Sequence, residues 1–376
     1  MEIKRAYRFG FYPTPEQEQS LARTFGCTRF AYNYMLRERT NAWRNERRRV
    51  GYPETSALLT QLKKTPEHIW LNEVSSVPLQ QSLRHLNKAF GNFFARRSQY
   101  PNFRKKDGKQ SAEYTKSAFK WHQGVLSLAK AGALRVRFSK TIPRGADVTT
   151  VTVSKDPAGR YFVSMLCADT VAKKARAGKA MGIDLGLTHF ATLSTGKKLD
   201  NPKVFAENER KLARAQRVLA RKRKGSANRK KAKLKVARLH ARISDLRKDF
   251  LHQLSTRLIN ENQVIFVETL SVRNMQKNHC LAKAISDASW SEFVRQLEYK
   301  ARWYGRMLVK VDRWFPSSKR CSECGTIAPK IPLSVREWCC PECGKTHDRD
   351  VNAARNILTA GLAGLVCGEN VSPVPL

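Results

Sequence analysis

Four cysteines near the C-terminal end of the sequence have the spacing of a metal site. Two Cys-x-x-Cys pairs are separated by fifteen residues, and each pair is followed by a glycine. This pattern is typical of a structural zinc site, in which four thiolates surround the ion as a tetrahedron. Cys339 is left over, because using it would break the two-residue gap to Cys343. We therefore predict one structural Zn²⁺ in a zinc ribbon over residues 320–345, with four ligands: Cys321, Cys324, Cys340 and Cys343.

Three acidic residues occupy positions that suit a bound cation. Asp184 follows a short apolar run, and Glu268 lies inside the apolar segment VIFVETL. A carboxylate in such a place costs free energy unless it is paired or bound to a cation. Asp350 follows the cysteine pairs and begins the amphipathic segment DVNAARNIL. An acidic residue at this point can also be a helix N-cap, and His347 and Asp348 compete with Asp350 for the cation.

The composition indicates a polyanionic partner. The 376 residues include 71 Lys and Arg against 31 Asp and Glu, which gives a net charge of +40 and favours nucleic acid. No apolar run approaches the roughly 18 residues that span a bilayer, and the N-terminus lacks the apolar core of a signal peptide. Cysteines outside the C-terminal cluster are scattered singly, which suits a reducing cytoplasm. We expect a cytoplasmic, nucleoid-associated prokaryotic protein with two or three domains.

The N-terminal third combines a strand with a set of helices. Residues 3–11 alternate and include aromatic and β-branched types, which predicts a strand. Thr14, Pro15 and Gln17 then have the types of a helix start with a capping box. Helical segments are predicted from there to about residue 97.

One predicted helix, 78–97, has an apolar stripe and a polar face. The stripe is formed by Leu79, Leu83, Leu86, Phe90, Phe93 and Phe94. The polar face is either simply solvated or suited to base edges and phosphates, since Gln, Asn and Arg allow both. A basic, aromatic segment, YPNFRKKDGKQ, follows the helix. The candidate nucleic-acid contacts in this region are Gln80, Gln81, Arg84, Lys88, Arg104 and Lys105.

Short alternating runs separated by Gly and Pro turns come next, and they predict strands. These runs cover residues 125–128, 134–138, 148–154 and 161–167. Together with the N-terminal strand they predict a small β-barrel made of residues 1–12 and 116–172. Residues 13–115 would then be a helical insert in the barrel, and the basic stretch 173–179 a linker.

The second half starts with an apolar strand that carries Asp184 and a further strand after a Gly-rich turn. A basic helical region is predicted over 207–260, with an apolar stripe of Leu239, Ile243, Leu246, Phe250, Leu254 and Leu258. Its charges either solvate a helix or contact phosphates, and their density through RKRKGSANRKKAK favours phosphates. The candidate contacts there are Arg221, Lys222, Arg223 and Lys224. The predicted order of elements ends with a strand that carries Glu268, a helix at 290–305, a strand at 307–311 and the segment that starts at Asp350.

This order is the layout of an RNase H-like domain. In that fold, adjacent central strands bring Asp184 and Glu268 together, and the last helix brings Asp350 alongside. Three convergent carboxylates repel, and two Mg²⁺ ions roughly 3.5–4 Å apart would relieve the repulsion. One ion would activate a water and the other would stabilise the leaving 3′-oxygen. The motif GIDLG also opens actin-like and sugar-kinase ATPases, but the sequence has no second phosphate-binding Gly loop.

These residues give the sequence a family likeness: it resembles TnpB, a family encoded by insertion sequences and related to type V CRISPR effectors. The resemblance is carried by FPSSKRCSECG, WCCPECGKTHDRDVNAARNIL, GIDLGLTHFATLSTG, VIFVETLSVRNM and the N-terminal YRFGFYPTPEQEQSLARTFGCTRFAYN. It implies an α/β multidomain, RNA-guided, metal-dependent DNA endonuclease. The implied nuclease domain is RuvC-like, covers 180–319 and 346–360, and is interrupted by the zinc ribbon. By motif match, its catalytic triad falls on Asp184, Glu268 and Asp350, not on Asp348.

The resemblance also implies a wedge role for the barrel, a recognition role for its helical insert, and several partners. These are a guide RNA from the element's own end, double-stranded target DNA with a short target-adjacent motif, and Mg²⁺, with Mn²⁺ able to replace it. We expect a monomer in a ribonucleoprotein, no membrane partner, and a mobile tail at 361–376. Two alternatives remain open: a DNA-joining transposase, whose signature would be strand transfer, and a nuclease-independent RNA-guided DNA-binding regulator.

Overall fold

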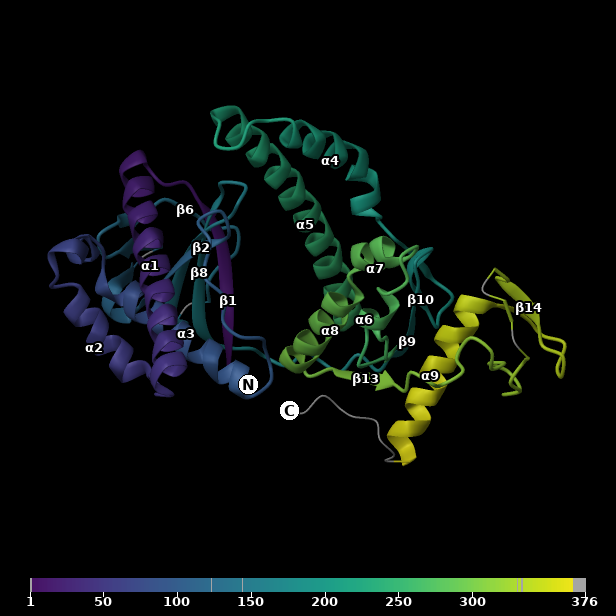
Figure 1. Ribbon diagram of the computed structural model, residues 1–376. Coiled ribbons are helices and arrows are strands. Elements are labelled where there is room, and N and C mark those ends of the chain that lie inside the picture. The colour runs from purple at the N-terminus through teal and green to yellow at the C-terminus, as the bar shows by residue number, and fades with distance from the viewer. Residues whose placement is uncertain (1, 123, 144, 330, 333, 368–376) are drawn as a thin grey trace. The chain divides into compact units, whose positions relative to one another are not determined.

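Figure 1 shows the chain in the computed structural model, which describes residues 2–122, 124–143, 145–329, 331–332 and 334–367. The chain divides into two compact units, one of residues Glu2–Thr170 and the other from Val171 onward. Each unit has its own apolar core, so each is described by itself.

The N-terminal unit contains the expected helices. They are α1 (Pro15–Glu46), α2 (Tyr52–Leu62), a 3₁₀ segment (Pro66–Glu73) and α3 (Ser76–Phe94). The predicted capping box of α1 is confirmed, since Gln17 N donates to Thr14 Oγ1 at 3.3 Å and Thr14 N donates to Gln17 Oε1 at 3.1 Å. Most of the predicted stripe of α3 is buried, but Phe94 is 66% exposed. Its assignment to the stripe is wrong, because the last turn of α3 extends beyond the helical core.

The strands of this unit form two antiparallel sheets. The larger sheet has the order β2-β7-β8-β1-β6, and the smaller has the order β3-β4-β5. The strands are β1 (Glu2–Phe11), β2 (Gln110–Thr115), β3 (Phe119–His122), β4 (Val125–Leu128), β5 (Gly132–Leu134), β6 (Val136–Arg137), β7 (Asp147–Lys155) and β8 (Tyr161–Thr170). Both sheets and α1 contribute side chains to one core, including Leu126, Val163 and Phe25.

Two details of the predicted barrel are wrong. Within the described residues, β2 and β6 end the larger sheet without pairing with each other, so the strands form an open sheet and a separate meander. In addition, β2 pairs with β7 from Gln110 onward. The helical insert therefore ends before Gln110 rather than at residue 115, because this segment belongs to the sheet.

The C-terminal unit is built on a mixed sheet with the order β11-β10-β9-β12-β13. Its strands are β9 (Ala180–Leu185), β10 (His189–Leu193), β11 (Lys198–Asp200), β12 (Val264–Glu268) and β13 (Met307–Val311). The neighbouring strands β9, β12 and β13 are parallel, with β13 at the edge of the sheet, and β10 runs antiparallel to β9. Because β9 and β12 are parallel neighbours, the residues at their carboxyl ends lie at one edge of the sheet.

The unit also contains six helices within the described residues. They are α4 (Val204–Ala220), α5 (Ala227–Glu261), α6 (Val272–Met275), α7 (Ala282–Ala288), α8 (Trp290–Tyr304) and α9 (Arg349–Cys367). Of these, α8 and α9 pack on the sheet, and α4 and α5 form a hairpin that projects from it (Figure 1). Phe190 of β10 packs edge-on against Phe250 of α5 and Phe293 of α8, which joins these elements in one core. On α5, Leu246 is 44% exposed, so its place in the predicted stripe is wrong. Within the described residues, every helix falls short of the length and apolarity needed to cross a bilayer.

The helix α9 packs on the sheet at two glycines. A Cβ at Gly182 would lie 2.2 Å from the Ala354 carbonyl oxygen, and one at Gly361 would lie 1.9 Å from Phe266 Cδ1. Only glycine allows the backbones to approach this closely. The prediction of a mobile tail is therefore wrong for residues 361–367, which continue α9. Residues 368–376 lie outside the described residues.

Candidate active site

Asp184 and Glu268 lie side by side because of the register of two parallel strands. The pair Ile183 and Val267 is in register between β9 and β12, and both carboxylates directly follow that pair. The Leu185 N–H donates to Glu268 Oε1 at 3.3 Å, which joins the two strand ends. Ile183 and Leu185 are buried on either side of Asp184, and Val267 is buried directly before Glu268. The structure thus brings together two residues that are 84 positions apart in the sequence.

Burial favours the protonated form of both carboxyl groups. It is the main cause that raises the pKa of Asp184 well above its usual range, and the negative charges of Glu268 and Asp350 raise it further. Burial also raises the pKa of Glu268 to about 7, although the Leu185 N–H partly stabilises the anion. Because each added anion raises the pKa of Asp184, the three carboxyl groups lie within electrostatic reach of one another.

The structure distinguishes Asp350 from its neighbour Asp348. Asp348 Oδ1 accepts hydrogen bonds from the N–H groups of Asp350 at 3.1 Å and Val351 at 3.0 Å, so Asp348 caps α9. Its Oδ2 accepts from Lys198 Nζ at 2.6 Å. Asp350 makes neither contact; its closest cationic partner is Arg336, whose Nη1 lies 3.5 Å from Oδ1. The cap of α9 therefore belongs to Asp348, whereas the Asp350 carboxylate makes one longer ion pair and acts on the pKa of Asp184.

The donor set fits divalent cations that prefer oxygen ligands. Among the described residues, neither Asp184 nor Glu268 has a Lys or Arg ion-pair partner, and the more distant charge of Arg349 only partly offsets the raised pKa of Asp184.

The four predicted cysteines meet at one point. Their Sγ atoms all lie within 4.8 Å of one another, with Cys321 and Cys343 at 3.6 Å and Cys324 and Cys340 at 3.6 Å. Gly325 and Gly344 have φ values of +81° and +67°, which lets the backbone turn beneath each pair. Cys339 is outside the set, and its Sγ lies 3.1 Å from the Gly344 carbonyl oxygen. A site of four thiolates is what a structural Zn²⁺ requires.

Residues that the sequence analysis missed attach this ribbon to α9. Asn352 and Asn356 are buried one turn apart on α9, and both side chains donate to the Arg320 carbonyl oxygen, directly before the first cysteine. Asn352 Oδ1 also accepts from the Ser322 N–H at 2.9 Å. The sequence could have indicated this contact, because two asparagines four residues apart lie on the same face of a helix.

His347 and Arg349 add two further connections between the ribbon and α9. The His347 ring, in β15 (Thr346–Asp348), is buried, and its Nε2 lies 3.0 Å from Cys321 Sγ. Trp338 lies in the paired strand β14 (Glu337–Cys339), and its ring centroid is 5.1 Å from that of His347. Arg349 Nη1 donates to the Pro332 carbonyl oxygen at 2.6 Å. The segment that carries Asp350 is therefore held against the loops that carry the four cysteines.

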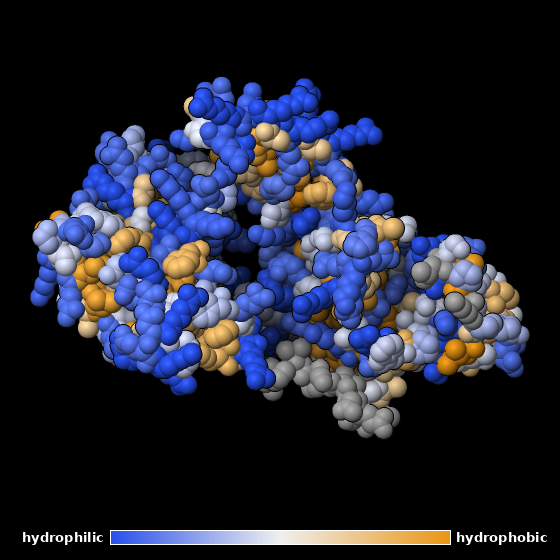
Figure 2. Space-filling model, in the orientation of Figure 1, coloured by the Kyte–Doolittle hydropathy of each residue, from blue (hydrophilic) through white to orange (hydrophobic). Residues whose placement is uncertain are grey.

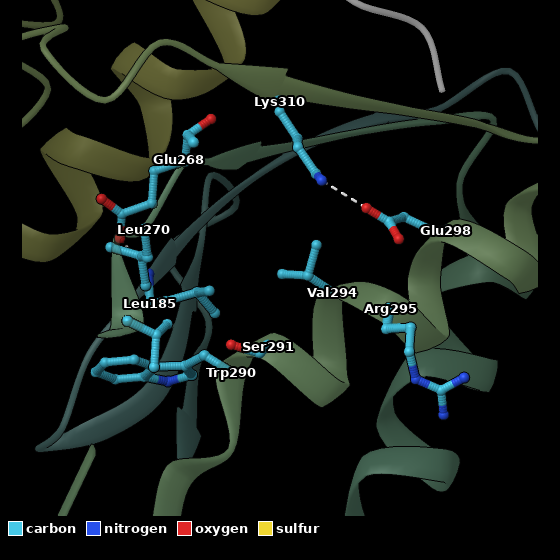
Figure 3. Close-up of a pocket in the computed structure, with 11 residues that line it drawn as sticks. Leu185, Glu268, Leu270, Trp290, Ser291, Val294, Arg295, Glu298 and Lys310 are labelled. Carbon is cyan, nitrogen blue, oxygen red and sulfur yellow. Dashed lines mark hydrogen bonds and ion pairs between the residues drawn. The ribbon is translucent and has the colours of Figure 1, made fainter. Parts of the chain in front are cut away.

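A cavity of about 210 Å³ lies beside Glu268 (Figure 3). Its walls include apolar side chains of Leu185, Trp290 and Val294. At its far end Lys310 forms an ion pair with Glu298 at 2.5 Å, which Figure 3 shows as a dashed line. The cavity therefore borders Glu268 alone among the three carboxylates and lies on the side of α8.

The predicted nucleic-acid contacts fall into three groups. Arg221, Lys222, Arg223 and Lys224 are all exposed in the turn between α4 and α5, where Figure 2 shows mainly hydrophilic side chains. Gln80, Arg84 and Lys88 are exposed on α3, whereas Gln81 is only partly exposed. Lys105 is exposed, but Arg104 is partly buried with its guanidinium 3.8 Å from the Tyr32 ring centroid. Arg104 thus has a packing role in addition to any contact with nucleic acid.

Comparison with known proteins identifies the family. The chain is 59% identical over 99% of its length to a Streptomyces pristinaespiralis protein named "Putative RNA-guided DNA endonuclease", and it covers 93% of that relative. It is 34% identical to "Putative RNA-guided DNA endonuclease InsQ" of Escherichia coli K12, with 99% of this chain and 96% of that one aligned. Residues 151–279 match the OrfB_IS605 family, described as "Probable transposase". The chain belongs to the TnpB family.

Two further matches concern parts of this TnpB-family chain. Residues 290–357 match the TNB domain of Cas12f1-like proteins, and this range includes α8, β13, the ribbon and the start of α9. Residues 1–48 match a family described as "Helix-turn-helix domain", but here they form β1 and the single helix α1.

The fold is similar to that of a solved structure, "Cryo-EM structure of the Cas12f1-sgRNA-target DNA complex". The TM-score is 0.58 at 12% identity, and the alignment covers 95% of this chain and 98% of that one. At this identity the similarity shows the fold alone, and the TnpB-family chain therefore shares the architecture of that effector.

Proposed function

We propose that the chain is an RNA-guided DNA endonuclease of the TnpB and Cas12f type. The observation that carries the proposal is the convergence of Asp184, Glu268 and Asp350, two of them with raised pKa values, at one edge of a mixed sheet. The close relatives whose names describe RNA-guided DNA endonucleases support the substrate class. The net charge of +40 supports a nucleic-acid partner.

In this proposal Asp184, Glu268 and Asp350 hold two Mg²⁺ ions. When bound, the ions supply an activated water and charge stabilisation at the leaving oxygen. The chain's own contribution is to hold the three carboxylates close together in a partly desolvated place, where they release protons as cations bind. The cysteine site, proposed to hold one Zn²⁺, positions Asp350 through the asparagine contacts of α9.

The remaining parts divide the recognition of nucleic acid. Base pairing with a guide RNA reads the target sequence, and the protein holds the paired strands by shape and charge. The exposed basic turn between α4 and α5 contacts phosphates, and the polar face of α3 reads the target-adjacent motif. The two sheets of the N-terminal unit act as the wedge, and α1–α3 act as the recognition insert.

The experiment that tests this function begins with the RNA that purifies with the protein. We expect one abundant RNA, and we expect the complex to cut DNA that matches its variable end in the presence of Mg²⁺. Plasmids with randomised flanks would reveal the adjacent motif among the cut products. A complex that binds matched DNA but cuts none, with Mg²⁺ or Mn²⁺, would identify a regulator instead. Joined strands among the products would identify a transposase.

A further inference from the structure

An aromatic pocket in the N-terminal unit is not used by the proposed chemistry. It has a volume of about 670 Å³ and lies between α1 and the segments around His68 and Phe103. Phe30 and Tyr34 of α1 have ring centroids 5.6 Å apart, and the His68 ring lies 5.4 Å from Phe30. Phe103 also lines the pocket and is 58% exposed. Several planar rings at one open pocket form a surface on which another planar group can stack.

Cationic groups surround these rings. The Arg37 guanidinium lies 4.9 Å from the Tyr34 ring centroid, and Arg29 lines the same pocket. One carboxylate, Glu67, is also at the pocket. The combination of aromatic faces with an excess of guanidinium groups is the arrangement that binds unpaired nucleotides, with the base on a ring and the phosphate on a cation.

Hydrogen bonds fix the segments that line the pocket. The Asn33 side chain donates to the Arg104 carbonyl oxygen at 3.0 Å and accepts from the Arg104 N–H at 2.8 Å. These two bonds fix the segment of Phe103 against α1. His68 is fixed as well, since its Nδ1 lies 3.0 Å from Thr65 Oγ1. The rings are therefore positioned before any ligand binds, which lowers the entropy cost of binding.

We propose that this pocket binds an unpaired nucleotide of the guide RNA. A paired base has both faces covered by its neighbours, so only an unpaired base can enter. Resting on the proposed function, the inference favours RNA over DNA. The guide-matched and displaced DNA strands differ at every site, and the constant target-adjacent motif is double-stranded, whereas the constant part of the RNA is the same in every complex and can offer an unpaired base. A preformed pocket for one base suits a partner whose sequence at that position is the same in every complex.

The test uses the complete ribonucleoprotein and three variants. Phe103→Ala removes an exposed ring, and Tyr34→Leu removes the ring beside Arg37. Trp43→Ala is the matched control, because Trp43 is also on α1, is 45% exposed and has Arg47 5.8 Å from its ring centroid, but does not line the pocket. Thermal unfolding of each variant separates a folding defect from a binding defect.

Two readouts are measured: nucleotide-resolution chemical probing of the RNA in the complex, and the dissociation constant for the RNA. We expect one unpaired nucleotide, protected in the wild type and in Trp43→Ala, to become reactive in both pocket variants. Loss of one stacked base should weaken RNA binding about fivefold to a hundredfold.

Unchanged reactivity and affinity in two folded pocket variants would overturn the inference and leave the proposed function intact. Loss of protection on the displaced DNA strand alone would also overturn it, because the occupant would then be DNA. If the wild type carries no RNA, the proposed function fails first and the inference fails with it.

Discussion

The candidate site depends on the negative charge that its three acidic side chains carry when they are ionised. Asp184 and Glu268 have raised pKa values because the fold buries them next to each other without a cationic partner. Such an arrangement costs stability when the carboxyl groups are ionised, and either protonation or a bound cation would relieve that cost. Burying these groups lowers the stability of the fold, and such perturbed carboxyl groups are typical of functional sites.

Each of the three carboxylates should be essential for cleavage. Asp184→Ala, Glu268→Ala and Asp350→Ala should each abolish the cutting of matched DNA, and double changes should cost little more, since groups that act as one unit are not additive. Guide-dependent DNA binding should survive. The measurement is plasmid cleavage alongside a binding assay, with Mg²⁺ for cutting and Ca²⁺ for binding without efficient cutting.

Asp348→Ala is the matched control for these variants. It removes the cap of α9 and the ion pair with Lys198, so it should lower stability by about 1 kcal/mol while retaining substantial cleavage. A dead Asp348→Ala combined with an active Asp350→Ala would mean that the two residues had been assigned the wrong roles.

Glu268 should also set a pH dependence of stability. A carboxyl whose pKa is about 7 when folded binds more protons in the folded than in the unfolded protein, so the free energy of unfolding should fall as the pH rises from about 4 to about 7. Glu268→Gln cannot ionise and should lose this part of the pH dependence. At pH 8, in buffer without divalent cations, it should be more stable than the wild type by on the order of 2 kcal/mol.

Thermal unfolding at pH 5 and pH 8, with zinc content checked, measures this effect. Glu298→Gln is the control, because Glu298 lines the same cavity but pairs with Lys310, so its loss should bring no gain. Added Mg²⁺ should then stabilise the wild type and not Glu268→Gln. A wild-type stability that is level between pH 4 and pH 7 would contradict the prediction.

At the scale of elements, the zinc ribbon and α9 act as one part. The cysteines hold the ribbon, Asn352 and Asn356 attach it to the helix, and Asp350 is in the first turn of that helix. The cysteine spacing was sufficient to predict the ribbon, because metal ligands must lie within a few ångströms of one ion. Residue type and position alone could not decide between Asp348 and Asp350, because both are acidic residues at a helix start. The family resemblance favoured Asp350, and the hydrogen bonds of Asp348 as the cap of α9 agree with that choice.

Loss of zinc should therefore displace Asp350. Cys343→Ser should lower the zinc content, make the ribbon sensitive to protease and reduce cleavage at least tenfold. Cys339→Ser is the control, since its Sγ is outside the four-thiolate set, and it should keep both zinc and activity. Metal analysis by mass spectrometry and limited proteolysis provide the measurement. A freshly purified wild type without zinc would refute the assignment.

The polar face of α3 should contribute to reading the target-adjacent motif. Gln80→Ala and Arg84→Ala should change which flanking sequence is cut, because both side chains are exposed and their amide and guanidinium groups suit base edges. Gln81→Ala should have a smaller effect, since this side chain is only partly exposed. The measurement is cleavage of a library with randomised flanks, and guide RNA binding should stay unchanged. A preserved flanking preference in all three variants would place the reader elsewhere.

At the scale of the whole molecule, the strand and helix order was predictable because period-2 and period-3.6 patterns are local. The β12 and β13 strands and α8 lie within two residues of their predicted ranges. The closure of the barrel was not predictable, because pairing between strands is set by contacts that are distant in sequence. The extension of α9 past Gly361 was missed for a similar reason: it depends on Phe266 of β12 fitting against a glycine.

The basic turn between α4 and α5 should supply phosphate contacts that can be counted. The logarithm of the binding constant falls with the logarithm of the salt concentration by roughly 0.7–0.9 for each phosphate contact. Replacing Arg221, Lys222, Arg223 and Lys224 with Gln should lower this slope by up to about 3, since all four side chains are exposed. The measurement is the dissociation constant of the guide RNA, and of matched DNA, over a range of salt concentrations.

The control replaces Arg47, Arg48 and Arg49, which are exposed in the loop after α1, with Gln. If the α4–α5 turn contacts phosphates directly, the slope should fall more per removed charge there than in this loop. Equal changes per charge would mean that the turn adds only to the general field of a molecule with a net charge of +40. An unchanged slope would mean that its four charges are only solvated, because phosphates held by direct contact must release counterions when they bind.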